Sequence, residues 1–286
     1  MKNKILSNNK SLCIKESEVV EMDKYKGKDK IAGKPIRLNR KKLMIKQSKD
    51  YAEVVFFGDL HFGARECDIE RAKRMLEYCE IHRIYLFLMG DLMEASTRYS
   101  VGSGVYEQLS PQKQLDFIID LLKPLADEGL ILGTLSGNHE NRIYKETGIN
   151  VMKIIANVLK IPFLGDACWN LFYVGKESYI VYTLHGASGS RYVYTKLKSV
   201  VDIAHSFNAE LMVMGHVHDL ADVALTMQTV DRKRKMVTEF KKHILISGHY
   251  LKYDRSYAQM KGLPIGKEGS PKVKFYSEKH DIHISY

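Results

Sequence analysis

The stretch LMVMGHVHDL, residues 211–220, places His216 and His218 one residue apart at the end of an apolar run. Paired imidazoles can bind a metal ion, although histidines also stand at strand ends without any ligand. Four other apolar runs of the chain also end in a small residue beside a side chain that can bind metal. These side chains are Asp59 with His61, Asp91, Asn138 with His139, and His185. Five such coincidences are hard to attribute to packing, so together they predict one shared site.

The predicted site has the composition of a metal centre. In α/β folds, sites form outside the carboxyl ends of strands, where glycines let the backbone turn sharply. Carboxylate, imidazole and amide ligands suit Mn²⁺, Fe, Zn²⁺ or Ni²⁺, whereas a Ca²⁺ site would use fewer imidazoles. The candidates are too many for one ion, so we expect two ions bridged by Asp91, whose carboxylate has two oxygens. The predicted ligands are Asp59, His61, Asp91, Asn138, His185, His216 and His218.

The five blocks read GDLHFG, GDLME, GNHE, LHG and GHVH in chain order. In this order the chain resembles the calcineurin-like metallophosphoesterases over about residues 51–220. The resemblance implies that one ion is held by Asp59, His61, Asp91 and His218, and the other by Asp91, Asn138, His185 and His216. It also implies that His139 contacts the substrate phosphate and protonates the leaving oxygen, and that Glu140 orients His139.

The resemblance implies a dinuclear phosphoester hydrolase, in which a hydroxide held between two ions, most simply Mn²⁺, attacks phosphorus. The family acts on phosphoproteins, nucleotides, lipid precursors and DNA ends, so it leaves the substrate open. GDLHFG and LHG resemble the nuclease branch, which favours a phosphodiesterase or nuclease acting on DNA, RNA or a nucleotide. Alternatives are a phosphomonoesterase or protein phosphatase, and a non-catalytic scaffold with the same fold. Three arginines follow ligand blocks and could bind phosphate: Arg65, Arg98 and Arg142.

The charge of the chain is concentrated at its N-terminal end. Residues 1–50 contain 15 Lys or Arg and 6 Asp or Glu, so they carry +9 of the total net charge of +10. Such an arm can hold a polyanion such as nucleic acid, or it can be a solvated tail. A nucleic-acid-binding module with the arm as its main function is therefore a third interpretation. We predict a basic, partly disordered extension over residues 1–50 and a metallophosphoesterase domain over residues 51–286.

The pattern of apolar residues predicts the elements that position the site. Short buried strands are expected at 53–57, 84–89, 130–135 and 211–214, with a hairpin over 171–184. Helices are expected after Asp68, after Ser110, over 149–160 and over roughly 191–207. The tail contains the strand-like segments VALTM, MVTEF, HILIS, KVKFY and IHIS, with DRKRK (231–235) as a hairpin tip. Alternating strands and helices followed by strands predict an α/β fold, a layered β-sandwich flanked by helices with a β-rich C-terminal part.

Other sequence features limit where the protein acts. No apolar run is long enough to cross a membrane, and the first residues lack the apolar stretch of a signal peptide. The four cysteines are scattered without a CxxC pair, which favours reduced thiols in a cytoplasmic protein. These features indicate no membrane partner, and they leave the oligomeric state open.

Overall fold

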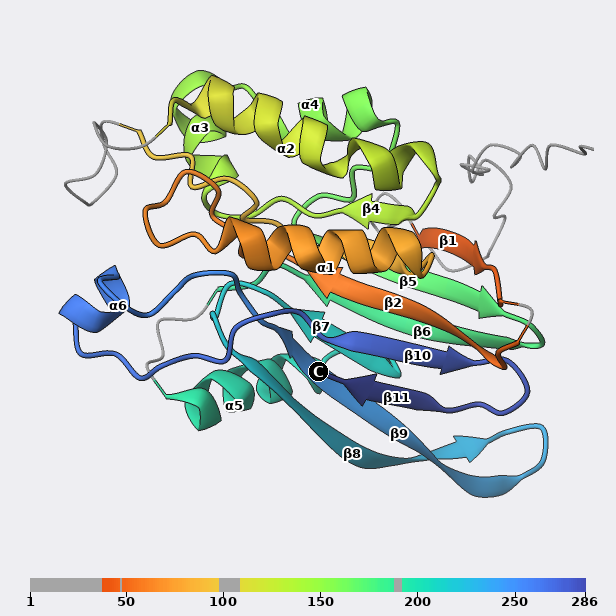
Figure 1. The fold of residues 1–286 in the computed structure, drawn as a ribbon. Coiled ribbons are helices and arrows are strands. Elements are labelled where there is room, and N and C mark those ends of the chain that lie inside the picture. Colours follow the sequence, from red (N-terminus) through yellow and green to blue (C-terminus); the bar gives the residue numbers. More distant parts are fainter. Residues whose placement is uncertain (1–37, 47, 98–108, 188–191) are drawn as a thin grey trace, which may run out of the picture. The chain divides into compact units, whose positions relative to one another are not determined.

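The computed structural model describes residues 38–46, 48–97, 109–187 and 192–286. They belong to one compact unit that begins at Arg37 and ends at Tyr286. Two sheets pack face to face, with helices on both outer faces (Figure 1). The predicted fold class, a layered α/β/β/α sandwich, is confirmed.

The first sheet has five strands in the order β11-β10-β2-β3-β4. Its parallel centre consists of β2 (Tyr51–Phe57), β3 (Tyr85–Leu88) and β4 (Ile131–Thr134). The antiparallel strands β10 (Lys272–Tyr276) and β11 (Ile282–Ser285) extend it beyond β2. Because β2, β3 and β4 are parallel, the segments that follow them emerge at one edge of the sheet.

The second sheet has six strands in the order β1-β5-β6-β7-β9-β8. Their bounds are β1 Leu38–Leu43, β5 Ala167–Val174, β6 Glu177–Leu184, β7 Leu211–Met214, β8 Leu220–Asp231 and β9 Met236–Ser247. β6 and β7 are parallel, with Leu184 opposite Met214, so the residues after both strands lie together. β1 falls within the segment predicted as an extension, yet it pairs with β5 along its whole length.

The long β8–β9 hairpin carries the basic turn DRKRK, as expected from the sequence. The stretches MVTEF and HILIS, expected as separate segments, are the two ends of the single strand β9.

The helices begin close to the predicted positions. Asp68 and Ser110 accept N–H groups of the first turns of α1 (Ile69–Ile81) and α2 (Pro111–Asp127). α4 spans Val151–Leu159 and α5 spans Val193–Ala204. Two short helices were not expected, α3 (Glu140–Thr147) and α6 (Tyr257–Met260). Within the described ranges, no helix is both long and apolar enough to span a membrane.

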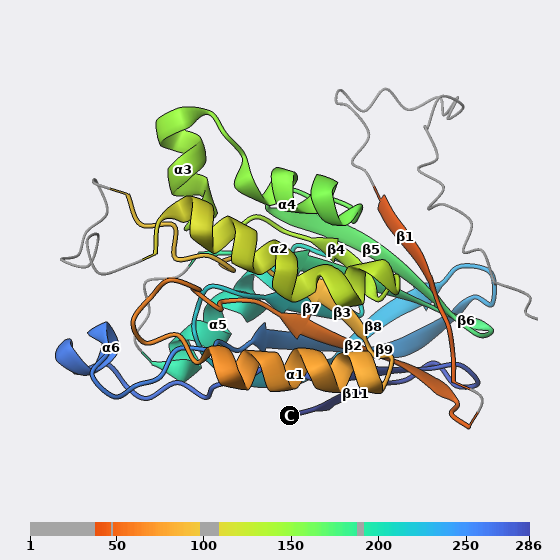
Figure 2. The same cartoon turned by 45° about the horizontal axis from the view of Figure 1, so that its top comes forward.

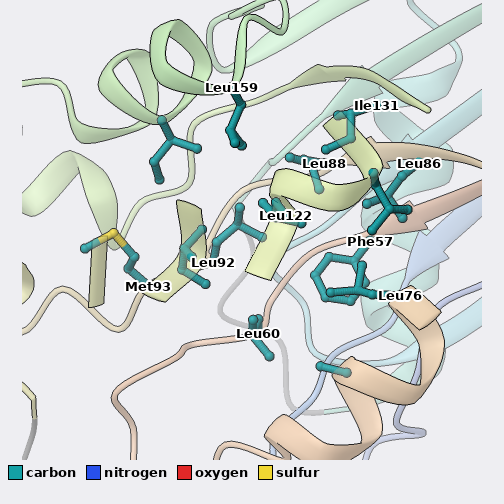
Figure 3. Packing of buried hydrophobic residues seen from close by; sticks show 14 of the residues in the cluster. Phe57, Leu60, Leu76, Leu86, Leu88, Leu92, Met93, Leu122, Ile131 and Leu159 are labelled. Carbon is teal, nitrogen blue, oxygen red and sulfur yellow. The ribbon is translucent and has the colours of Figure 1, made fainter. Parts of the chain in front are cut away.

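Alternation along β2 divides the core into two layers. Val54 and Phe56 face the second sheet, whereas Val55 and Phe57 face α1, α2 and α4. Figure 3 shows the helix-facing layer, where Phe57 lies near Leu76 of α1. Each such buried side chain contributes roughly 1.5–3 kcal/mol relative to an exposed one. α5 covers the opposite face, over β7 and β9, as Figure 2 shows from another side. This packing holds the strand ends at fixed positions.

Candidate metal centre

Glycines at the strand ends let three loops approach one another closely. A Cβ added at Gly90 would lie 2.7 Å from the backbone nitrogen of Gly137. A Cβ at Gly137 would lie 2.0 Å from Asp91 Oδ1, and one at Gly58 would lie 2.7 Å from the Cβ of Met89. Only residues without a side chain fit at these points, so the loops after β2, β3 and β4 can bring their polar residues together.

Several site residues hold a left-handed backbone that non-glycine residues rarely adopt. Such a conformation costs roughly 1–3 kcal/mol and persists only where the surrounding structure enforces it. The φ angles are +48° at Asp59, +50° at His61, +49° at Asp91, +66° at His216 and +48° at His218. Strain repeated at three different loops indicates that the fold is arranged to direct these side chains inward.

Asp59, His61 and His218 form a first cluster of side chains that can bind a metal ion. The Nε2 atoms of the two histidines are 3.0 Å apart, and His218 Nε2 lies 3.4 Å from Asp59 Oδ1. Asp59 is completely buried. Three potential ligand atoms thus converge from the loops after β2 and β7.

Asp91, His185 and His216 form a second cluster. His185 Nε2 lies 3.2 Å from Asp91 Oδ2, and Asn138 Oδ1 lies 3.0 Å from His185 Nε2 and 2.6 Å from His216 Nδ1. The amide oxygen of Asn138 therefore completes a set of four donors. These come from the loops after β3, β4, β6 and β7.

Asp91 connects the two clusters. Its Oδ2 atom is 3.2 Å from His185 Nε2 and 3.8 Å from His61 Nε2. This oxygen is buried and makes no hydrogen bond with any described residue. An unpaired buried carboxylate oxygen is costly unless a cation or donor meets it. Divalent cations fit these donors, because buried carboxylates, imidazoles and an amide oxygen are their usual ligands.

Electrostatics among the side chains alone indicate the same need for positive charge. Burial alone would lower the pKa of His185, but Asp91 and Asp59 outweigh it and raise that pKa to about 10. Burial opposes ionisation of Asp91 as well, yet His185 and His61 hold its pKa well below the usual range. A protonated imidazole thus balances the buried carboxylates, which is a role that cations could take over.

Hydrogen bonds on the outer side orient two of the candidate ligands. His185 Nδ1 lies 2.9 Å from the carbonyl oxygen of Met89, and His61 Nδ1 lies 3.0 Å from Glu94 Oε2. Since each Nδ1 faces an acceptor, the neutral ring carries its proton on Nδ1. The Nε2 lone pair of His61 then points into the site, and that of His185 would do so once a cation replaces its second proton. Such partners fix the tautomer of a metal-binding histidine.

His139 lies against both clusters. Its backbone N–H donates to Asp91 Oδ1 at 2.8 Å, and its ring packs edge-on against His61 with centroids 4.3 Å apart. Its side chain also lies close enough to His61 and Asp91 to bind an ion with them. His139 Nδ1 lies 2.9 Å from the carbonyl oxygen of Glu94 and 3.2 Å from Glu94 Oε2. Arg142 Nη2 donates to His139 Nε2 at 2.8 Å.

Glu94 is a residue of the site that the sequence analysis did not identify. Its carboxylate contacts His61, His139 and Arg142. Burial opposes the charged form of His139, but Glu94 and Asp91 outweigh it and raise the pKa of His139. The signal was present in the block GDLME, because Glu94 is the one other carboxylate there and stands three residues after Asp91.

The expectation that Glu140 orients His139 is wrong. Glu140 is buried at the start of α3 and accepts the backbone N–H groups of Asp91, Met93 and Gly137 at 3.0–3.1 Å. Burial and the charge of Asp91 raise the pKa of Glu140 to about 7. The longer glutamate arm reaches under the loops and ties the segment after β3 to the segment after β4.

The three arginines predicted to contact phosphate differ in position. Arg142 lies beside His139, at the edge of the two clusters. Arg65 is exposed in the turn after His61. Arg98 lies outside the described residues. All seven predicted metal ligands are brought together. Of the two of these arginines that the structure describes, Arg142 is the one placed to reach a ligand there.

Comparisons with known proteins agree with the arrangement of motifs. The model of the calcineurin-like phosphoesterase family matches residues 52–220. A search of curated proteins found no significant match.

Three solved structures are similar to this chain at 12% sequence identity. A predicted phosphoesterase from Streptococcus pneumoniae TIGR4 has a TM-score of 0.36, with 83% of this chain and 90% of the other covered. Vps29 from Entamoeba histolytica, complexed with zinc, has a TM-score of 0.36, with 82% and 97% covered. A metallophosphoesterase from Sphaerobacter thermophilus has a TM-score of 0.34, with 82% and 88% covered. Similarity at this level carries no argument about activity.

Proposed function

Because the chain belongs to the calcineurin-like phosphoesterase family, we propose that it hydrolyses phosphodiesters of nucleic acid or nucleotides with the help of two divalent metal ions. Asp59, His61, Asp91 and His218 would hold one ion. Asp91, Asn138, His185 and His216 would hold the other. Mn²⁺ is the first metal to test, because it accepts this mixture of oxygen and nitrogen ligands.

One observation carries this proposal. The buried Asp91 carboxylate lies between two groups of donors and leaves Oδ2 without a hydrogen bond among the described residues. A scaffold protein has no need to keep buried carboxylates among four buried or half-buried histidines, because burying so many charged groups together is costly. A bridged pair of cations accounts for the carboxylate and the histidines together.

The protein side of the reaction follows from the hydrogen bonds of His139. When bound, the two ions would supply concentrated positive charge for the phosphate and an activated water nucleophile. Glu94 holds the Nδ1 side of His139, so Nε2 is the nitrogen that faces Arg142 and any ligand beyond it. A phosphate that draws the Arg142 guanidinium into a bidentate contact would release Nε2. The raised pKa of His139 favours uptake of a proton from water at the released Nε2, which would then pass this proton to the leaving oxygen.

Charge supports the choice of a nucleic-acid or nucleotide substrate. The net charge of +10 favours association with polyanions over association with neutral or basic partners. A phosphodiester also matches a site that combines cations with a proton donor, because its leaving alkoxide is poor and needs protonation.

The test is a panel of substrates assayed with Mn²⁺. The panel contains a chromogenic bis-ester, the matching mono-ester, and single- and double-stranded DNA and RNA. We expect hydrolysis of the bis-ester and of at least one nucleic acid, and loss of both activities in Asp91→Asn. Hydrolysis of the mono-ester alone would favour a phosphomonoesterase, and no hydrolysis with any tested divalent metal would favour a scaffold.

A further inference from the structure

Two exposed tyrosines stand at the beginning of α5. Tyr192 and Tyr194 are 55% and 70% exposed, and their rings lie nearly parallel, at 14°, with centroids 5.6 Å apart. Val193 between them is also exposed. Most large aromatic side chains of a folded protein bury their faces, so a preformed pair of open rings needs an explanation.

The tyrosine pair is connected to the metal centre through Lys196. Lys196, one helical turn after Tyr192, donates its backbone N–H to the carbonyl oxygen of Tyr192 at 2.9 Å. The Nζ atom of Lys196 reaches Asp219 Oδ2 at 3.3 Å and the carbonyl oxygen of His218 at 3.5 Å. The pair is therefore one turn away from a side chain that touches a candidate metal ligand. Figures 1 and 2 show the start of α5 at the end of the sheets where β6 and β7 finish.

A second segment meets the same side of the site. The backbone N–H of Lys267 donates to Asp219 Oδ1 at 3.2 Å. A Cβ added at the preceding Gly266 would lie 2.3 Å from the carbonyl oxygen of His218, so this loop packs directly against the ligand segment. Ile265, which precedes Gly266 in this loop, is 70% exposed. We call Tyr192, Tyr194, Lys196, Ile265 and Lys267 the α5 rim.

We propose that the α5 rim binds the bases of a single-stranded nucleic acid whose phosphodiester lies at the metal centre. This inference rests on the proposed function and names its substrate class. Stacked tyrosines offer flat faces on which unpaired bases stack without sequence preference, and the exposed Lys267 offers a positive charge to a phosphate. Bases inside a duplex are already stacked on each other, so the rim selects single strands, loops or frayed ends.

Charge complementarity favours nucleic acid over a peptide. The rim combines aromatic rings with the exposed Lys267, whereas the Lys196 side chain is only 12% exposed and is ion-paired with Asp219. This combination of aromatic faces and positive charge is typical of single-strand binding surfaces. A phosphopeptide would be attracted by the positive charge, but it has no series of flat bases to stack on two parallel ring faces.

The experiment measures binding by the full chain in a chelator, so that no cleavage occurs. The probes are a short fluorescent oligothymidylate and an abasic strand of the same length and charge. We expect the wild type to bind the strand with bases more tightly than the abasic strand. The double change Tyr192→Ala with Tyr194→Ala should remove this preference. It should weaken binding of the strand with bases by roughly fivefold or more. The matching Phe changes should keep the preference, because they keep the rings.

A third variant, Tyr78→Ala, controls for the loss of an exposed tyrosine elsewhere, on α1. It should bind both probes as the wild type does. Equal binding of the two probes by the wild type, or an equal loss on both probes in the double Ala variant, would overturn the stacking role. Tighter binding of a phosphopeptide than of the oligothymidylate would also overturn it.

The same variants separate this inference from the proposed function. The double Ala variant should hydrolyse a small bis-ester at the wild-type rate, because the metal centre and His139 are unchanged. If the wild type hydrolyses no ester at all, the proposed function fails, while the binding comparison still decides the role of the rim.

Discussion

Asp91 has the most demanding position among the single residues of the site. Its Oδ1 accepts the N–H of His139, and its Oδ2 lies between His61 and His185. Asp59, in contrast, has both oxygens bonded to the N–H of His216 and faces the first cluster. Replacing Asp91 should therefore weaken the binding of both ions, and replacing Asp59 mainly the binding of one.

We predict that Asp91→Asn weakens metal binding more than any other single ligand change. The amide keeps the shape but loses the charge that serves both clusters. The loss should exceed the roughly 10–100-fold that removal of an outer hydrogen-bond partner costs. Titration of the metal-free protein with Mn²⁺ measures it, with Asp59→Asn as the matched comparison. If Asp91→Asn holds two ions as well as the wild type, Asp91 is not the bridge.

His139 should contribute to the rate without holding the ions. His139→Ala is expected to keep both metals and to lose roughly 10²–10⁴-fold in rate, the usual contribution of a general acid. The loss should be smaller for a bis-ester with a nitrophenolate leaving group, which needs little protonation. Metal content and rates on good and poor leaving groups measure these effects. An equal loss on both substrates would mean that His139 only positions the phosphate, and loss of metal would make it a ligand.

For the single residues of the site, the positions along the chain could be predicted from the sequence, but the contacts could not. Each of the seven predicted ligands stands in a block that the sequence shows, such as GNHE or GHVH. The roles of Glu94 and Glu140 depend on which way a side chain turns after a sharp bend. Glu140 turns under the loops, and Glu94 turns toward His139. Spacing along the chain does not contain this information.

Among the elements, the loops after β3 and β4 set the distance between the two clusters. Gly137 lies against Asp91, where no side chain fits. The loop beyond it is held by Glu140, which bonds the backbone of both segments. The metal centre therefore depends on backbone contacts between loops as well as on its ligands.

We predict that Gly137→Ala impairs metal binding even though it changes no ligand. Its Cβ would lie 2.0 Å from Asp91 Oδ1, so the bridging carboxylate must move. The matched control is Gly148→Ala at the end of α3, where the added Cβ meets nothing within 4 Å and only the backbone is strained, at φ +74°. Mn²⁺ titration and urea unfolding of both variants measure the effects. The control should lose roughly 1–2 kcal/mol of stability and no metal affinity. Unchanged metal affinity in Gly137→Ala would contradict the close approach.

The strands and helices were predicted where local patterns are strong. The parallel strands β2, β3 and β7 are short apolar runs that end in glycine and a site residue, and α1 and α2 begin at clear capping residues. The structure differs where long-range pairing decides. β9 continues through MVTEF and HILIS because it pairs with β8 over twelve residues. β1 is polar in sequence, yet its backbone pairs with β5. α3 is short and polar, so its periodicity gave no signal.

For the whole molecule, the distribution of charge raises the question of a polyanion site. Residues 1–33 hold eight lysines and five acidic residues, so they carry +3 of the +9 in the first fifty residues. Within residues 34–50, Lys46 and Lys49 are paired with Glu53. Arg40 and Lys42 are exposed on β1. Deleting the terminal residues alone therefore tests only part of the arm.

We predict that deletion of residues 1–33 combined with Arg40→Gln and Lys42→Gln weakens binding of DNA or RNA. It should also lower the dependence of binding on salt, because fewer lysine–phosphate contacts release counterions. Hydrolysis of a small bis-ester should be unchanged, since the metal centre lies in other loops. Binding measured over a series of salt concentrations gives the slope. A slope equal to that of the wild type would leave the arm as a solvated tail and would favour a small nucleotide as the substrate.

The proposed metal centre has two ions that share Asp91. The most direct measurement is the number of ions bound by the full chain after chelator treatment, dialysis and titration with Mn²⁺, read by calorimetry and by elemental analysis of the same sample. We expect a saturating value that approaches two ions per chain, as for a two-metal phosphoesterase site. A value that never exceeds one ion at saturating metal would contradict it.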